Sequence, residues 1–164
     1  MEAARPATAS DLPRLADLRR MASDELRPMR GGELLLGREV QRGSGVASLA
    51  TDLDDPERGM WVGTIDGTIV GYSTGHVEQL GAAGDADDAP YMRLGVIDEL
   101  FVEADARAVG VGEAMMAAML AWFTAMGCSG VDALALPGNR STKNFFEESG
   151  FTARLLVMHR GLNG

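Results

Sequence analysis

The chain has 164 residues, 46% of them hydrophobic and 24% charged, a balance typical of one soluble globular domain over residues 1–164 and not of a disordered or fibrous protein. The net charge of -9 argues against nucleic acid and anionic membranes as partners, because both are bound through an excess of Lys and Arg. One cysteine cannot form an internal disulfide, and the sequence has neither a signal-peptide pattern nor an apolar run of membrane length, so we expect a cytoplasmic protein.

The N-terminal part of the sequence predicts a short strand followed by helices. The strand is expected over residues 4–8. Leucines at three- and four-residue spacing predict a helix from residue 12 to about residue 27. Residues 30–51 have a weaker pattern, for which we expect a helix over residues 33–41 and a second short helix after it.

The middle of the sequence changes to strand periodicity. Residues 60–65 and 68–77 are rich in β-forming side chains and are separated by Asp66-Gly67, which predicts a hairpin. Residues 81–90 contain several aspartates and no apolar periodicity, and are expected to form a loop. The apolar stretch 93–102 predicts the next strand.

The C-terminal part alternates between helix and strand patterns. A helix is expected over residues 111–126, where methionine and aromatic side chains share one face and are interpreted as core. A strand over 131–136, a helix over 141–149 and a last strand over 151–160 follow. This order predicts an α/β (α+β) fold with a mixed sheet.

A glycine-containing loop between a strand and a helix is the most informative feature. Residues 107–112, RAVGVG, lead directly into the predicted helix, whose free N–H groups and positive dipole end favour an anion such as a pyrophosphate. A dinucleotide loop would have a third glycine at Met115, and a triphosphate loop would have Gly-Lys-Ser/Thr; the sequence has neither. Two glycines that only turn the strand into the helix remain an alternative.

Two segments together resemble a known family. Residues 107–112 resemble the pyrophosphate loop R/Q-x-x-G-x-G/A of the GNAT superfamily of N-acetyltransferases, and residues 139–151 are similar to its N-x-x-x-x-x-F-Y-E-x-x-G-F segment. The spacing between the two segments also fits, and the resemblance is good over residues 96–160. It implies a GNAT-like mixed, mostly antiparallel central sheet flanked by helices, with a splayed parallel strand pair that forms the cofactor cleft.

The resemblance implies acetyl-CoA as co-substrate and suggests which residues hold it. The strand before the loop would lie beside the pantetheine arm, the loop would hold the pyrophosphate, and side chains of the second segment would contact the cofactor from across the cleft. These residues are Leu100, Phe101, Val102, Arg107, Ala108, Val109, Gly110, Val111, Gly112, Glu113, Asn139, Asn144 and Phe146.

A carboxylate beside the cleft would serve as the base that removes a proton from the amine. A primary amine like that of lysine has a pKa of roughly 10.4, so it must lose a proton before it attacks the thioester. Glu99 is the candidate catalytic base, with Asp98 second; strand alternation predicts that the two side chains point to opposite faces of the sheet. A main-chain N–H of the same strand is expected to hold the oxyanion.

The sequence departs from the family at Phe146, where a tyrosine commonly protonates the leaving thiolate. A thiol with a pKa of about 8.5 is still a tolerable leaving group, so transfer without that tyrosine remains feasible. Tyr72 and Tyr91, the only tyrosines, are expected to be half-buried strand residues.

Two functions therefore remain open. The first is an acetyltransferase that acetylates the primary amine of a small cationic or neutral molecule, and the second is a catalytically weak acyl-CoA-binding or regulatory module. No metal is expected in either case, because the two histidines and Cys128 are isolated in the sequence. The chain is expected to be a monomer or a homodimer.

Overall fold

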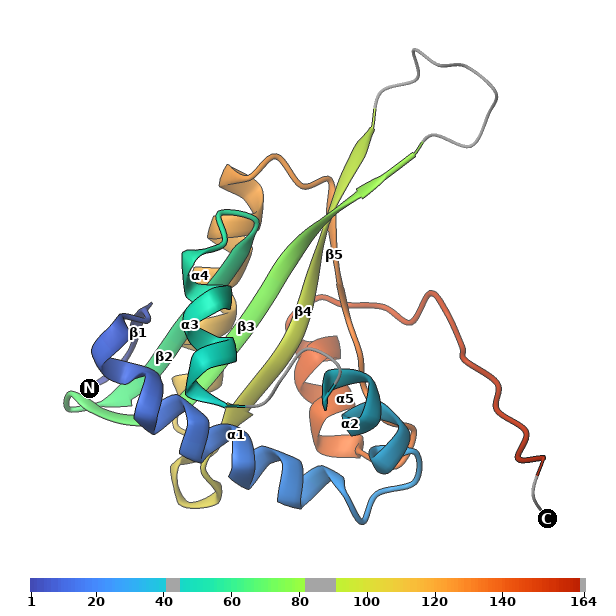
Figure 1. The fold of residues 1–164 in the computed structure, drawn as a ribbon, viewed down its shortest axis with the longest axis horizontal. Coiled ribbons are helices and arrows are strands. Elements are labelled where there is room, and N and C mark those ends of the chain that lie inside the picture. The colour runs from blue at the N-terminus through green and yellow to red at the C-terminus, as the bar shows by residue number, and fades with distance from the viewer. Residues whose placement is uncertain (41–44, 82–90, 163–164) are drawn as a thin grey trace.

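The computed structural model describes residues 1–40, 45–81 and 91–162 (Figure 1). The strands are β1 (Glu2–Pro6), β2 (Arg58–Ile65), β3 (Thr68–Leu80), β4 (Met92–Val102) and β5 (Gly130–Ala133). The helices are α1 (Leu12–Leu26), α2 (Gly32–Val40), α3 (Val46–Asp54), α4 (Val111–Ala125) and α5 (Arg140–Glu148). Short 3-10 turns precede α1 and follow β4.

The strands form one sheet in the order β1-β2-β3-β4-β5. Neighbouring strands are antiparallel except β4 and β5, which are parallel. Asp66 and Gly67 connect β2 to β3 with φ angles of 48° and 82°, the left-handed values that a tight hairpin turn needs. The structure thus confirms the predicted hairpin and the mixed, mostly antiparallel sheet.

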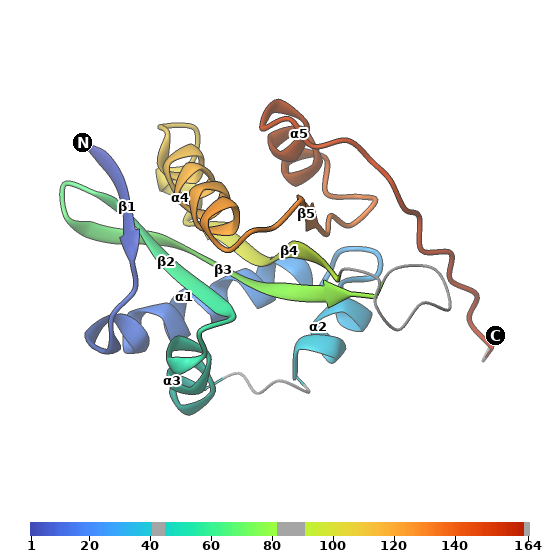
Figure 2. The same ribbon diagram turned by 90° about the horizontal axis from the view of Figure 1, so that it is seen from above.

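Helices cover both faces of this sheet (Figure 2). On one face α1 and α3 pack their leucines against alternate residues of β2 and β3, in a core that includes Leu15, Leu18, Leu49, Val62 and Tyr72. On the other face α4 contributes its methionines and Phe123, which pack with Trp61, Ile97 and the Phe146 ring of α5. The interpretation of the α4 methionines as core side chains is confirmed.

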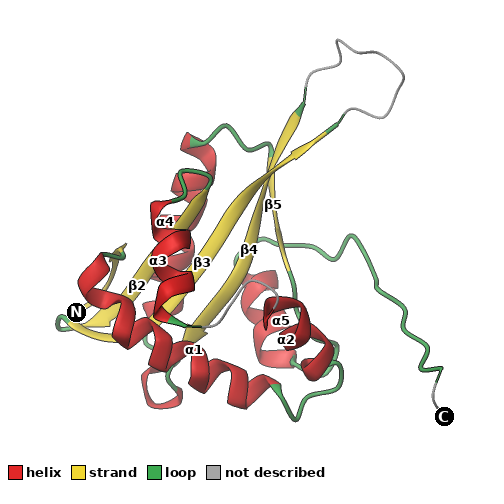
Figure 3. Cartoon of the chain, viewed as in Figure 1, coloured by secondary structure: helices red, strands yellow, loops and turns green. Residues whose placement is uncertain are grey.

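The prediction of a last strand over residues 151–160 is wrong. Phe151 packs against the core beside α5, but the chain from there to residue 162 forms no strand (Figure 3). A strand needs a partner for its backbone groups, and β5 pairs as a strand with β4 alone among the described residues, so residues 151–160 are not paired with its free edge. β5 itself ends at Ala133, where its partner β4 diverges from it, and does not continue to residue 136 as predicted.

Two predictions from the sequence concern residues that lie outside the described part of the chain. The predicted loop over residues 81–90 falls, apart from Gly81, outside the described residues, as does the end of the helix expected over 33–41. Within the described ranges, every helix is either too short or too polar to cross a membrane.

Candidate active site

The site begins where β4 and β5 separate. The parallel pairing runs from Leu94 opposite Gly130 to Ile97 opposite Ala133 and then stops, while β4 continues to Val102. A cleft of about 90 Å³ lies beyond this point, between the free side of β4 and the segment that leads to α5. Its lining includes Leu100, Phe101, Leu134, Leu136, Asn139 and Phe146. The structure therefore confirms the splayed parallel strand pair.

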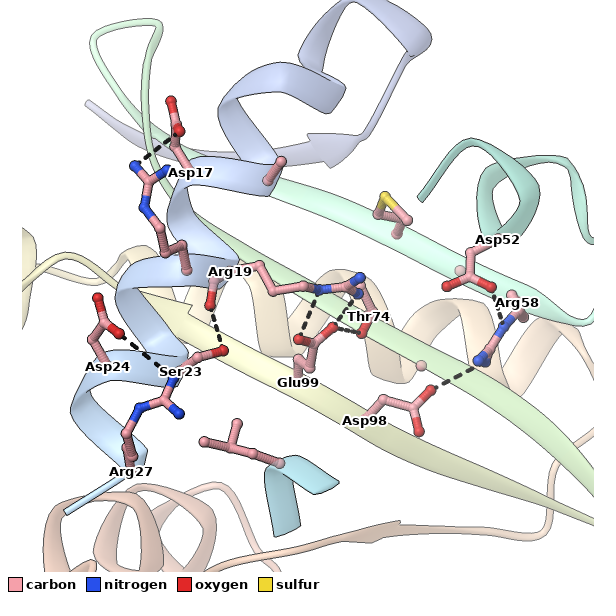
Figure 4. Close-up of a pocket in the computed structure, with 16 residues that line it drawn as sticks. Asp17, Arg19, Ser23, Asp24, Arg27, Asp52, Arg58, Thr74, Asp98 and Glu99 are labelled. Carbon is pink, nitrogen blue, oxygen red and sulfur yellow. Dashed lines mark hydrogen bonds and ion pairs between the residues drawn. The ribbon is translucent and has the colours of Figure 1, made fainter. Parts of the chain in front are cut away.

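A bulge in β4 changes the direction of its side chains at the mouth of this cleft. Thr74 of β3 is opposite Glu99, but the next residue, Gly75, is opposite Ile97, so that Asp98 is an extra residue in β4. Asp98 and Glu99 consequently both line the same pocket (Figure 4). The expectation that only one of them faces the site is wrong, because regular alternation does not hold at a bulge.

A larger pocket of about 450 Å³ adjoins the cleft, and Ser23, Asp98 and Glu99 line both. Residues of α1 form one wall, and the bulged region of β3 and β4 faces it (Figure 4). Acidic and basic side chains alternate around the pocket. Those on α1, at its C-cap and on β2 are Asp17, Arg19, Arg20, Asp24, Arg27 and Arg58.

Glu99 is held from all sides by hydrogen-bond donors. Arg19 reaches it from α1 with its Nε 3.0 Å from Oε1 and its Nη2 2.5 Å from Oε2. The Tyr72 hydroxyl donates to Oε1 and the Thr74 hydroxyl to Oε2, each at 3.0 Å. A carboxylate has about four lone-pair positions, so accepting a proton requires Glu99 to release one of these donors.

Asp98 belongs to a second network that extends to β2 and α3. His76 Nδ1 lies 2.9 Å from Asp98 Oδ2, and Arg58 bridges Asp98 and Asp52 at 3.3 and 3.0 Å. The hydrogen bond to Asp98 raises the pKa of His76 above its usual value of 6.5, against the opposing effect of burial. Both carboxylates of the bulge are therefore anchored to β3, while α1 holds Glu99 and β2 holds Asp98.

The N-terminus of α4 has the open geometry that the loop motif predicts. Gly110 is its N-cap at φ 99°, and no side chain among the described residues caps the helix. The first intrahelical bond joins the Ala114 N–H to the Gly110 carbonyl at 3.0 Å, so the preceding N–H groups are those that face the helix end. Gly112 has another role, because a Cβ there would lie 3.2 Å from the Phe145 ring of α5.

Arg107 is turned away from the helix end in this structure. Its Nε donates to the Val102 carbonyl at 2.8 Å, its Nη2 lies 2.7 Å from Glu25 of α1, and its guanidinium stacks over the Phe101 ring. The ion pair with Glu25 is nearly half exposed on both sides, and such a pair contributes little. Arg107 is thus beside the loop but committed to other groups.

The second motif is only partly directed at the cleft. Asn139 lines the cleft and also caps α5, where its Oδ1 accepts the Thr142 N–H at 3.2 Å. Phe146 is buried and lines the cleft, whereas Asn144 is exposed and is not among the lining residues. The structure therefore brings Glu99, Leu100, Phe101, Asn139 and Phe146 together around the cleft.

Several residues of the site were not identified from the sequence. Arg19, Thr74 and His76 carry no motif, and they reach the carboxylates from α1 and β3 through tertiary packing. Tyr72 is fully buried and not half-buried, and it lines the cleft with its hydroxyl on Glu99. The one available signal was the alternation in β3, which places Tyr72 and Thr74 on the same face.

Similar proteins share this architecture. A tetramutant of the BH1408 protein from Bacillus halodurans has a TM-score of 0.77 at 17% identity, covering 97% of this chain and 99% of that chain. AAC(6')-Iy, in complex with the bisubstrate analogue CoA-S-monomethyl-acetylneamine, has a TM-score of 0.70 at 18% identity, with 98% of each chain covered. An aminoglycoside acetyltransferase from an uncultured soil metagenomic sample has a TM-score of 0.69 at 19% identity, covering 99% and 95%.

The family assignment rests on the amino-acid sequence. The solved structures have too low a sequence identity to this chain to show more than a shared fold. No curated protein sequence matches the chain. The model of the acetyltransferase (GNAT) family matches residues 19–151, which include the C-terminal half of α1, the bulged strand, the glycine loop and α5. The chain belongs to the GNAT family of acetyltransferases and is an N-acetyltransferase with acetyl-CoA as its co-substrate.

Proposed function

We propose that this protein transfers an acetyl group directly from acetyl-CoA to the primary amine of a small molecule. The observation that carries the proposal is the junction of two cavities at one bulge. The narrow cleft between β4 and β5 and the larger pocket under α1 share Asp98 and Glu99. An acyl donor in the cleft and an amine in the pocket would therefore meet beside two carboxylates.

The cleft suits the elongated donor. Beyond Ile97 the main chain of β4 has no β5 partner in the described structure, which leaves backbone groups to pair with the amides of a pantetheine arm. The open N-terminus of α4, from Gly110 to Glu113, would hold the pyrophosphate. Arg107 would leave its ion pair with Glu25 and contact the pyrophosphate instead. Acetyl-CoA supplies an activated thioester carbonyl; the protein binds and orients it.

The carboxylates at the bulge in β4 accept the proton of the amine. The amine arrives as an ammonium ion, which Asp98 and Glu99 attract, and one of these carboxylates takes its proton directly or through water before the C–N bond forms and the C–S bond breaks. Glu99 performs this role only if a donor such as Tyr72 or Thr74 moves aside. A main-chain N–H of β4 beside the bulge would stabilise the oxyanion.

The charges around the pocket favour an amine with few positive charges. Each carboxylate that lines it is ion-paired with an arginine: Asp17 with Arg20, Asp24 with Arg27, Asp52 and Asp98 with Arg58, and Glu99 with Arg19. A polycation would have to compete with these guanidinium groups. We therefore propose a small cationic or neutral acceptor with one reacting amine.

A catalytically weak acyl-CoA-binding module is the second candidate, and Phe146 is the observation that favours it. The ring is 8% exposed, packs against Phe151 and presents no hydroxyl to the cleft. Calorimetry with acetyl-CoA tests both candidates, since both require binding at ligand concentrations of about 1 mM or below.

Thiol release with a panel of small amines then distinguishes the two. We expect turnover in the wild-type protein, a loss of at least about tenfold in kcat in either Glu99→Gln or Asp98→Asn, and unchanged acetyl-CoA binding in that variant. Arg20→Gln, at the exposed rim of the pocket, is the control for a nonspecific change of charge. Binding of acetyl-CoA without turnover of any amine would support the regulatory module instead.

A further inference from the structure

The pocket between α1 and the bulge of β4 carries charges of both signs. Among the described residues, five carboxylates and four guanidinium groups line it, so its own charges nearly cancel. A ligand with an ammonium group alone would match the carboxylates, but it would leave arginine N–H groups that face it without a partner once water is displaced. A ligand with one ammonium and one anionic group would match both sets.

Arg58 of β2 has donors that could bind such an anion. Its Nε lies 3.0 Å from Asp52 and its Nη1 lies 3.3 Å from Asp98 (Figure 4). A guanidinium has five N–H groups and binds a carboxylate best through two of them at once. Each aspartate here accepts from only one nitrogen, and Nη2 donates to no acceptor in the described part of the chain.

The unused side of this guanidinium is accessible. The Arg58 side chain is 17% exposed and lines the pocket. Within the described ranges, the buried side-chain atoms that lack a hydrogen-bond partner are Ser73 Oγ and Arg93 Nε, and Arg58 Nη2 is not among them. An anion in the pocket can therefore accept a hydrogen bond from Nη2 while Asp52 and Asp98 stay bound.

The other arginines of the pocket are poorer sites for an anion. Arg19 is already bound to Glu99 through both Nε and Nη2. Arg20 and Arg27 have side chains that are 71% and 59% exposed, and an ion pair in such a position contributes little. Arg58 is thus the largely buried arginine that is not already bound bidentately.

The position of Arg58 limits the distance between the anion and the reacting amine. Its guanidinium contacts Asp98, one of the two carboxylates that attract the ammonium group. His76 Nδ1 also lies 2.9 Å from Asp98, so the charge of this carboxylate is not balanced by Arg58 alone. An anion on Arg58 and an ammonium on Asp98 are therefore neighbours. In an α-amino acid, these two groups are bonded to the same carbon.

We propose that the acceptor is a free α-amino acid, whose carboxylate binds Arg58 and whose ammonium group lies at Asp98 and Glu99. The inference rests on the proposed acetyl transfer and narrows its acceptor. One of the two carboxylates takes the first proton, the C–N bond forms as the C–S bond breaks, and the second proton of the amine neutralises the leaving thiolate. The products are an N-acetyl amino acid and CoA.

Matched pairs of acceptors test the role of the carboxylate. Leucine, tyrosine and arginine are compared with isopentylamine, tyramine and agmatine, which keep the same side chains and lack the carboxylate. In the best pair, kcat/KM for CoA release should be at least about tenfold higher for the amino acid, because a site that binds a polar group rejects the analogue without it. Amines that react as well as their amino acids overturn this inference and leave the proposed acetyl transfer standing.

Calorimetry with the protein–CoA complex gives a second measurement that does not require turnover. We expect an amino acid to bind at least about tenfold more tightly than its decarboxylated counterpart. Binding of amino acids without any CoA release from acetyl-CoA upholds the inferred site and refutes the proposed transfer. No binding of any amino acid at about 10 mM is evidence against the inferred site itself.

The substitution Arg58→Gln separates binding of the carboxylate from support of Asp98. It should lower kcat/KM at least about tenfold more for the amino acid than for the matched amine, and Arg58→Lys should restore part of the difference. An arginine that only positions Asp98 would affect both acceptors equally, and that result contradicts the inference.

Arg5→Gln is the matched control. It removes a guanidinium that is paired with a buried aspartate, Asp11, and lies outside the pocket, so the preference for amino acids should persist. Thermal unfolding verifies that each variant is folded. If Arg58→Gln does not fold, Arg58→Lys provides the same comparison, with a smaller preference for the amino acid than in the wild-type protein as the expected result.

Discussion

Arg19 of α1 and Glu99 of β4 form a bidentate ion pair across the junction of the two cavities, with Arg19 Nε 3.0 Å from Glu99 Oε1. Both side chains are largely buried, at 13% and 14% exposure. The pair therefore ties the helix that forms one wall of the pocket to the strand that carries both candidate bases, and it sets the orientation of the Glu99 carboxylate.

Replacing Arg19 should destabilise the fold strongly. We expect Arg19→Leu to lower the free energy of unfolding by about 3 kcal/mol, because Glu99 is then buried without its cation. Urea unfolding measures the effect. Arg20→Leu, which removes an exposed pair with Asp17, should cost less than about 1 kcal/mol. A double variant with Glu99→Gln should recover part of the loss; if it does not, the ion pair is not the cause.

Restoring a hydroxyl at Phe146 should increase turnover. This ring lines the cleft, so Phe146→Tyr would present a proton donor to a leaving thiolate there, and we expect kcat to rise on the order of tenfold. Steady-state kinetics at several pH values checks this. Phe145→Tyr is the control, because that ring packs on Gly112 and does not line the cleft. Equal effects of the two substitutions would contradict a specific role for position 146.

A side chain at Gly110 should weaken both the fold and the binding of acetyl-CoA. Its φ of 99° is in the left-handed region, so Gly110→Ala is expected to cost roughly 1 kcal/mol or more of stability and to disturb the helix end. Thermal unfolding and calorimetry measure the two effects. Gly138→Ala is the control, since its Cβ would meet no atom within 4 Å and its φ is ordinary. Unchanged acetyl-CoA affinity in Gly110→Ala would place the pyrophosphate elsewhere.

His76 should make stability depend on pH. Asp98, assisted by Glu78 and opposed by burial and Arg58, raises the pKa of His76, so the folded protein binds this proton more tightly than the unfolded chain. The resulting stabilisation is fully present below the unfolded value of about 6.5 and is lost as the pH rises through the folded pKa.

The substitution His76→Gln measures this contribution. The difference in unfolding free energy between wild type and variant should be larger at about pH 5.5 than at about pH 9. Proton NMR of the imidazole gives the pKa itself. A difference that grows with pH would mean that Asp98 does not stabilise the imidazolium.

Much of the fold was predictable because it depends on local patterns. The Asp66-Gly67 turn, the amphipathic α1, the apolar α4, and the strand that leads through the glycine loop into α4 were each readable from residues close together in sequence. The family resemblance depends on two such local segments, and the family model confirms it over residues 19–151.

The failures of prediction have a common physical origin. The bulge depends on how β4 aligns with β3, and because of it Asp98 and Glu99 line the same pocket. In a regularly alternating strand, only one of the two side chains would face that pocket. A strand depends on a partner, and residues 151–160 have the composition of one without a partner in this structure.

The sequence alone determined the composition of the fold, the acidic character of the chain and the glycine loop at the start of α4, because propensity, charge and turn chemistry are local properties. Only the tertiary structure decided that Arg19, Tyr72 and Thr74 hold Glu99, and that His76 and Arg58 hold Asp98. These contacts join residues far apart in the chain, and their geometry is set by the packing of α1 on the sheet and by one extra residue in β4.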